Sequence, residues 1–201
     1  MSIEATLARI SEIQGLLAPQ APATGGTPAP PAFASQLLQA SGPAASAAMV
    51  PAAGGSGAGQ AMVNLVRNEV GVAEQPPGSN DAPRIAQYRQ ATAGAAVGPW
   101  CAYFVSWAAR EAGVPIGDAG QGFGLVDDVW AWGERSGKAI PAGTGTPQPG
   151  DLIVWDEHIG IVESVAADGT IATIEGNSSD SVARRRYGSD GGGAIGYVRL
   201  G

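Results

Sequence analysis

The chain contains one cysteine and one histidine, and these two residues are the first candidates for chemistry. Cys101 follows a proline at the start of the apolar stretch "GPWCAYFVSWAAREAG". Pro99 suits the first turn of a helix, because the N–H that it lacks would be unpaired there anyway. Free backbone N–H groups and the positive end of the helix dipole favour the thiolate, the nucleophilic form of cysteine. The alternative is that Cys101 is a small buried apolar side chain, the usual state of a free cysteine.

The second candidate, His158, opens the strand-like stretch "HIGIVESV". A lone histidine is more often structural than catalytic, so its neighbours decide between the two interpretations. Alternation along a strand places Glu175 and Asn177 of "TIATIEGN" on one face. A carboxylate or amide beside an imidazole fixes its tautomer, as a catalytic base requires. We therefore expect Glu175 or Asn177 to orient His158.

The register between these two strands decides whether the polar side chains meet. If residues 166–169 form a four-residue hairpin loop, Val165 pairs with Thr170. A slip of one residue would turn the whole set to the other face of the sheet. The predicted cross-strand pairs are His158 opposite Asn177 and Gly160 opposite Glu175.

Helices and then strands are predicted to position these residues. Helical spacing of apolar residues occurs in residues 59–72, 80–92, 99–113 and 125–137. Strand-like stretches follow at residues 151–155, 158–165, 170–176, 182–187 and 194–200. Asn80 or Asp81 is expected to cap the second helix, with Pro83 in its first turn, and Gly113 to end the third. This order indicates an α+β fold with an antiparallel sheet.

Residues 1–59 differ from the rest of the chain in composition and in the spacing of apolar residues. Residues 1–18 are expected to form an amphipathic helix, because apolar residues recur at helical spacing at Ile3, Leu7, Ile10, Ile13 and Leu17. Residues 19–59 are rich in Ala, Pro, Gly and Ser, which predicts a disordered linker. The start lacks the basic segment and solid apolar block of a standard secretory signal. The folded domain is expected at residues 60–201.

Composition excludes several classes of function. The net charge of −7 argues against nucleic acid and anionic membranes as main partners. One cysteine excludes an internal disulfide and a four-thiolate zinc site, and one histidine excludes a two-histidine metal site. No apolar run approaches the roughly 18 residues that cross a membrane.

Six stretches of residues 60–201 form an ordered set of motifs: "EQPPGSNDAPRIAQY", "PWCAYFVSWAAREAGV", "PQPGDLIVW", "HIGIVESV", "TIEGNSSD" and "IGYVRL". Together they resemble the CHAP domain, the cysteine, histidine-dependent amidohydrolase/peptidase family of bacterial cell-wall hydrolases. The most specific part of the resemblance is "PWCAYFVSW" followed by "PGD" and "HIGIV".

The resemblance implies a papain-like α+β fold, with N-terminal helices packed on an antiparallel sheet of about five strands. It implies a peptidoglycan hydrolase that cleaves an amide bond, as an endopeptidase or as an N-acetylmuramoyl-L-alanine amidase. Cys101 matches the nucleophile, His158 the base, and Glu175 and Asn177 the pair that orients the histidine. Some family members bind calcium through a repeated D-x-D segment, which "VGVAEQPPGSNDAP" lacks. We therefore expect no metal and no cofactor.

Trp100, Trp155 and Asn80 are candidates for the substrate cleft. Each has a structural alternative, because the tryptophans can be core residues and Asn80 can cap a helix. The expected partner is peptidoglycan, and the expected state is a monomer.

The N-terminal "SIEATLARISEIQGLLAP" and the later "FASQLLQA" resemble the front of flagellum-associated wall hydrolases. This resemblance implies docking on a flagellar or other export assembly through residues 1–40. It also implies an extracytoplasmic location, in the wall or secreted, without a standard signal peptide.

Two other functions fit the same motifs. The domain could be an inactive wall-binding or structural module that is docked by its N-terminal helix. It could also be a transfer enzyme that joins amines instead of adding water.

Overall fold

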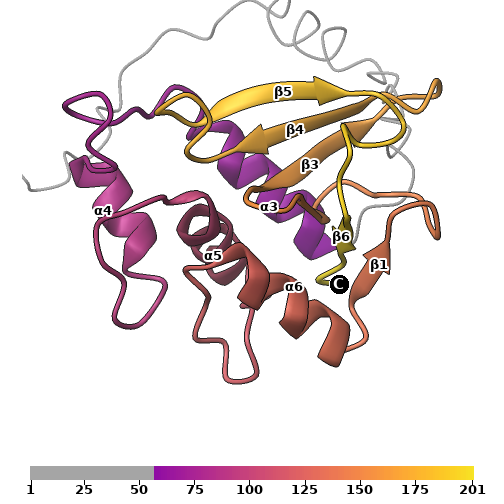
Figure 1. The fold of residues 1–201 in the computed structure, drawn as a ribbon, viewed down its shortest axis with the longest axis horizontal. Helices are drawn as coiled ribbons and strands as arrows, with labels where there is room; N and C mark the ends of the chain where they lie inside the picture. Colours follow the sequence, from indigo (N-terminus) through magenta and orange to yellow (C-terminus); the bar gives the residue numbers. More distant parts are fainter. Residues whose placement is uncertain (1–56) are drawn as a thin grey trace, which may run out of the picture. The chain divides into compact units, whose positions relative to one another are not determined.

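Helices precede strands along residues 57–201, the part of the chain that the computed structural model describes (Figure 1). The helices there are α3 (Gly57–Arg67), α4 (Pro83–Arg89), α5 (Cys101–Glu111) and α6 (Val126–Arg135). The strands are β1 (Ala139–Pro141), β2 (Leu152–Val154), β3 (Ile159–Val165), β4 (Ile171–Glu175), β5 (Ala183–Tyr187) and β6 (Gly196–Val198). This order confirms the predicted α+β fold. The predicted N-terminal helix and all but the last three residues of the predicted linker lie outside the described residues.

The described strands form one antiparallel sheet in the order β1-β6-β2-β3-β4-β5. The sequence predicted about five strands, and the sheet has six within residues 57–201. The strand that was missed is β1, which pairs with β6. Three residues are too few for an alternating pattern to be recognised in a sequence.

The predicted register of β3 and β4 is correct at one end of the hairpin and wrong at the other. Near the site, Val162 lies opposite Thr173, as the predicted pairs require. Near the loop, Val165 lies opposite Ile171 and not Thr170, because the register shifts between Val162 and Ser164. A bulge adds one residue to one strand, and the sequence carries no mark of it here.

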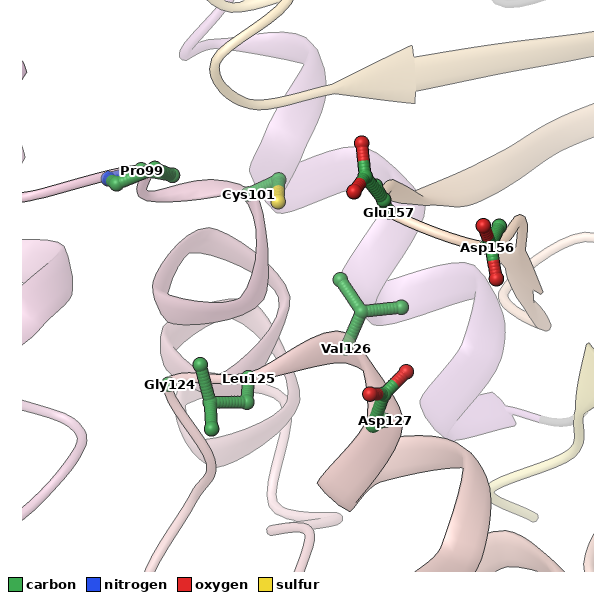
Figure 2. Close-up of a pocket in the computed structure, with 8 residues that line it drawn as sticks. All are labelled: Pro99, Cys101, Gly124, Leu125, Val126, Asp127, Asp156 and Glu157. Atoms are coloured by element: carbon green, nitrogen blue, oxygen red, sulfur yellow. The ribbon is translucent and has the colours of Figure 1, made fainter.

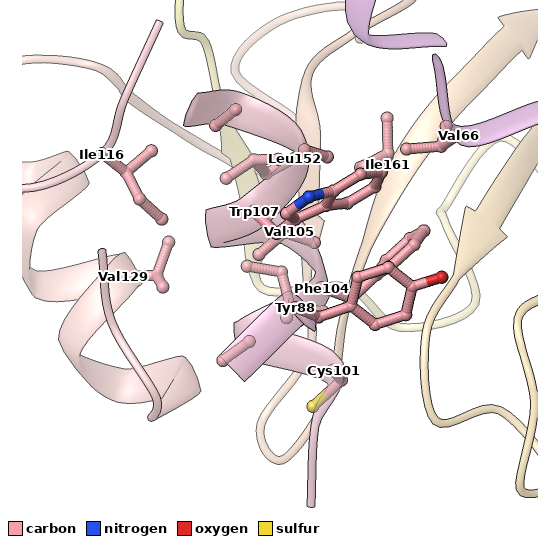
Figure 3. Close-up of a cluster of buried hydrophobic side chains, with 14 of the residues drawn as sticks. Val66, Tyr88, Cys101, Phe104, Val105, Trp107, Ile116, Val129, Leu152 and Ile161 are labelled. Atoms are coloured by element: carbon pink, nitrogen blue, oxygen red, sulfur yellow. The ribbon is translucent and has the colours of Figure 1, made fainter. Parts of the chain in front are cut away.

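Helices α3 and α5 pack on β3, and α5 lies at the centre of the domain (Figure 1). The main core lies between these helices and one face of the sheet (Figure 3). Eight of the eleven residues of α5 are buried, so the helix is covered nearly all round, as its two apolar faces predicted. Its C-terminal residue is followed by Ala112 and then Gly113, which ends the helix in the left-handed region with φ of 78°. No helix of residues 57–201 is long and apolar enough to cross a membrane.

Three helices begin differently from the prediction. Helix α5 begins at Cys101 with Trp100 at its N-cap, so Pro99 precedes the helix and does not lie in its first turn. Helix α3 begins at Gly57, and its first turn packs on the domain: a Cβ atom on Gly150 would lie 2.2 Å from the Cα atom of Gly59. Helix α4 has Ala82 at its N-cap with no side-chain cap, so neither Asn80 nor Asp81 caps it. Pro83 does occupy the first turn, as predicted.

The contact that joins α5 to the end of β4 leaves no room for a side chain at Gly176. A Cβ atom there would lie 2.6 Å from the Cβ atom of Phe104 and 2.9 Å from the ring of Trp100. We predict that Gly176→Ala lowers the free energy of unfolding by about 1–3 kcal/mol, because overpacking must push α5 away from the sheet. Urea unfolding of the full chain measures the change.

Gly98→Ala is the matched control for this prediction. No atom lies within 4 Å of a Cβ atom at Gly98, so we expect the free energy of unfolding to change by less than about 0.5 kcal/mol. Equal stability of the two variants would contradict the close approach of α5 to β4.

Candidate active site

Cys101 is the first residue of α5, and its side chain is buried with 5% of the residue exposed. Trp100 occupies the N-cap position, and no side chain caps the helix. The N–H groups of the first turn are therefore not taken by a cap, and such groups stabilise an anion at a helix N-terminus. The structure places the thiol where its sequence position predicted.

His158 lies immediately before β3 and reaches both Cys101 and Glu175. Its Nε2 atom lies 2.9 Å from Oε2 of Glu175, and the sulfur of Cys101 is near enough to the ring to raise its pKa. Because Nε2 faces the carboxylate, Nδ1 is the ring nitrogen left for the sulfur. The indole of Trp155 stacks on the imidazole with 5.6 Å between the ring centroids. The ring of His158 is thus held on three sides.

Glu175 is the last residue of β4, and 1% of it is exposed. Its Oε2 atom faces His158, and its Oε1 atom accepts hydrogen bonds from two hydroxyl groups. These come from Thr173, with an oxygen–oxygen distance of 2.5 Å, and from Tyr187, at 2.9 Å. A buried carboxylate needs such partners, because removal from water costs several kcal/mol if the charge is not compensated.

The pKa values of the histidine and the carboxylate move apart. Burial lowers the pKa of His158, but hydrogen bonds and negative charge from Cys101 and Glu175 outweigh it and raise the pKa to about 9. Burial raises the pKa of Glu175, but hydrogen bonds from His158 and Thr173 outweigh it and hold the pKa below its usual value. At neutral pH these shifts favour an imidazolium beside a carboxylate.

Asn177 does not share this contact. It follows β4 in the left-handed region with φ of 57°, and its side chain has no hydrogen bond within residues 57–201. Of the two predicted partners, Glu175 is the one that binds His158. Gly160 has no side chain to block this approach, since a Cβ atom there would lie 2.6 Å from Cγ of Glu175.

Trp100 and Asn80, two of the residues predicted to bind substrate, donate hydrogen bonds to a second buried carboxylate. Glu74 accepts hydrogen bonds from the indole N–H of Trp100, at 2.9 Å, and from the backbone N–H of Asn80, at 2.8 Å. Trp100 is fully buried against Tyr88 and Phe104, so substrate cannot reach it in this conformation. Its place is in the core, next to Cys101 in sequence.

Trp155, the third predicted substrate residue, lies beside His158. Its ring packs on His158 and also on Tyr187, with 5.1 Å between the latter centroids. Its indole N–H donates to the carbonyl oxygen of Gly191, at 2.9 Å. The side chain is partly exposed, so it can touch a ligand as well as support His158.

A cavity of about 400 Å³ opens at the sulfur of Cys101 (Figure 2). The start of α5 and the turn before His158 line one side, and the start of α6 lines the other. The lining residues are Pro99, Cys101, Gly124, Leu125, Val126, Asp127, Asp156 and Glu157.

Sequence reasoning missed four kinds of contributor: the hydroxyl groups on Glu175, the carboxylate of Glu74, the stacking role of Trp155 and the acidic lining of the cavity. Thr173 could have been found, because it shares the strand face of Glu175. Tyr187 could not, because the pairing of β5 is not visible in the sequence. Asp151 of the "PGD" motif has a structural role, since its carboxylate binds Arg199 at 2.8 Å.

Comparison with known proteins identifies the family of this site. Residues 91–177 match the family model described as the CHAP domain, and this range includes Cys101, His158 and Glu175. A comparison with curated proteins found no match. The match, the α+β fold and the predicted motifs agree with one another. Residues 91–177 of this chain are therefore similar to a CHAP domain, and the other residues lie outside the match.

Proposed function

We propose that this chain hydrolyses an amide bond of peptidoglycan with the thiolate of Cys101 as nucleophile. CHAP domains have amidase or peptidase activity of the kind that acts on peptidoglycan. One observation carries the proposal: the thiol at the start of α5 lies beside an imidazole whose Nε2 faces a buried carboxylate. This is the arrangement of nucleophile, base and orienting group that covalent catalysis requires.

In the first half of the reaction, the sulfur attacks the carbonyl carbon of the scissile amide. The carbonyl oxygen takes the negative charge, and the backbone N–H of Cys101 at the open start of α5 can stabilise it. His158 then donates its proton to the nitrogen of the leaving amine. The C–N bond breaks, the amine departs, and a thioester on Cys101 remains.

In the second half, water replaces the amine. His158, now neutral, takes a proton from the water while the oxygen attacks the thioester carbon. The C–S bond breaks, the carboxylic acid product leaves, and the thiolate–imidazolium pair is restored. Glu175 keeps the ring in place through both halves and stabilises its charged form. Asn177 keeps no role in this scheme.

We also propose an extracytoplasmic site of action and a monomeric enzyme. The first follows from the wall substrate of the family. The route of export, through docking of residues 1–40 on a flagellar or other export assembly, is supported by sequence resemblance alone.

Digestion of purified peptidoglycan by the full chain tests the nucleophile. We predict that Cys101→Ala lowers the rate by about 10³-fold or more, because the covalent route is lost. Mass spectrometry of the fragments identifies the bond, and water added across it identifies a hydrolase. A fragment that carries an added amine would instead indicate a transfer enzyme.

Unfolding of Cys101→Ala by urea controls for lost structure, and the neighbouring Ala102→Gly change controls for general damage to the start of α5. Wall that stays intact with the native chain under reducing conditions, and sediments with it, would favour the inactive binding module. Equal digestion by native chain and Cys101→Ala would remove the thiol from the mechanism.

The raised pKa of His158 predicts the alkaline limit of activity. The imidazolium is present below its ordinary pKa and is lost as the pH rises through about 9, so kcat/KM should fall with an apparent pKa of about 9. Glu175→Gln should move this limb about 1–2 pH units lower, because the carboxylate no longer holds the proton. A pH–rate profile of both proteins measures the shift. An unchanged limb in the variant would contradict the coupling.

Tyr187 is predicted to position the base through Glu175. Tyr187→Phe keeps the ring on Trp155 and removes only the hydroxyl on Oε1 of Glu175. We expect kcat to fall about tenfold with KM unchanged and the alkaline limb to move to lower pH. Tyr197→Phe is the control, because that buried tyrosine of β6 has no contact with Glu175. A similar fall in both variants would indicate a merely structural role.

A further inference from the structure

We propose that the cavity at Cys101 selects a wall peptide that carries a free ammonium group beside the scissile bond. This inference rests on the proposed hydrolase function and adds the chemical class of its substrate. Three carboxylates line the cavity, from Asp127, Asp156 and Glu157 (Figure 2). The sulfur of Cys101 lines the same cavity, so a substrate attacked by that sulfur must lie among these carboxylates.

The carboxylates come from the two elements that face each other across the cavity. Asp156 and Glu157 lie in the turn that leads to His158, directly before the base. Asp127 lies in the first turn of α6. In Figure 2, Cys101 and Glu157 lie on one side of the cavity, and Val126 and Asp127 lie on the other. A group that enters between them meets negative charge on both sides.

None of these three carboxylates has an ion pair or hydrogen bond within residues 57–201. The acidic residues that support the fold are engaged differently, since Glu69, Glu163 and Asp151 each bind arginine. The negative charge at the cavity is therefore available to a ligand. Exposed carboxylates of this kind contribute a few-fold each, so three give roughly tenfold or more.

The position of Asp127 at the start of a helix has a structural explanation, because acidic residues there complement the helix dipole. Asp128 lies in the same first turn and serves that purpose without lining the cavity. The dipole does not account for Asp156 and Glu157, which lie in a turn outside any helix. The negative charge at the cavity is thus greater than compensation of the α6 helix dipole explains.

The apolar residues that line the cavity indicate what kind of cation fits there. Leu125 is 65% exposed at the cavity, next to Val126, and gives an apolar surface beside the carboxylates. An alkyl chain that ends in an ammonium group fits such a mixed surface, because its stem can lie on apolar atoms and its charge can face the carboxylates.

This substrate class favours one of the two cleavage classes. A peptide bond in the stem or cross-bridge has amino acid residues on both sides, and either can carry a free amine. The amide that joins muramic acid to the stem has a lactyl group on one side, which has no amine. The proposed substrate class therefore favours an endopeptidase over an amidase.

Charged thiol reagents test the charge at the cavity without relying on catalysis. The full chain has one cysteine, so each reagent reports on Cys101. We would measure rate constants for 2-(trimethylammonium)ethyl and 2-sulfonatoethyl methanethiosulfonate. The ratio of the cationic to the anionic rate should fall at least tenfold when the three carboxylates are made neutral together. That variant is Asp127→Asn, Asp156→Asn and Glu157→Gln.

The matched control removes the same total charge elsewhere. It neutralises three exposed acidic residues that neither line the cavity nor have a side-chain partner in the described part of the chain. These changes are Asp128→Asn, Glu134→Gln and Asp180→Asn. The rate ratio should stay within twofold of the native value. An equal fall in both triple variants would overturn the inference, because net charge and not the cavity would then set the ratio.

Wall digestion separates this inference from the proposed function. The native chain should digest untreated peptidoglycan at least tenfold faster than peptidoglycan whose free amines are blocked by acetylation. The cavity variant should digest the two walls at rates within twofold of each other. Equal digestion of both walls by the native chain would keep the hydrolase and overturn the ammonium preference. No digestion of either wall would overturn the hydrolase, and the proposed substrate with it.

Discussion

The site depends on one buried carboxylate at the end of β4. Glu175 is almost entirely removed from water, so each of its oxygens must be bonded, and its partners are the imidazole of His158 and two hydroxyl groups. The same bonds that compensate the burial fix the position of the ring. The carboxylate that orients the imidazole of His158 is therefore also a buried charge that the fold must compensate.

A second buried carboxylate, Glu74, holds the residue before Cys101 in a similar way. Glu74 binds the indole of Trp100, the residue before Cys101, and the backbone of Asn80 in the loop ahead of α4. Aromatic contacts among Tyr88, Trp100 and Phe104 then hold the start of α5 from the other side. The thiol and the imidazole are thus carried by separate elements. Glu74 holds Trp100, the residue before Cys101, and Glu175 binds the imidazole of His158 directly.

Glycine decides how closely those elements approach. Gly176 allows α5 to reach the end of β4, and Gly160 allows the side chain of Glu175 to lie across β3. A Cβ atom at either position would lie 2.6 Å from a neighbouring carbon atom, closer than carbon atoms can approach. The spacing of sulfur, imidazole and carboxylate therefore depends on glycine at both positions. Outside these buried contacts, the cavity is lined by the exposed carboxylates of Asp127, Asp156 and Glu157. The charge of a ligand should therefore affect how it binds there.

Local patterns in the sequence determined the order of helices and strands, the place of Cys101 at a helix start and the family, because periodicity, proline and glycine act over a few residues. They also placed Glu175 within reach of His158, since alternation along a strand fixes which side chains share a face. The tertiary structure alone decided that Glu175 and not Asn177 binds the ring, that Trp100 is core, and that Tyr187 and Glu74 support the site. It also decided the bulge in β3 and the strand β1. Each of these depends on contacts between residues far apart in the chain, and no short-range pattern encodes such contacts.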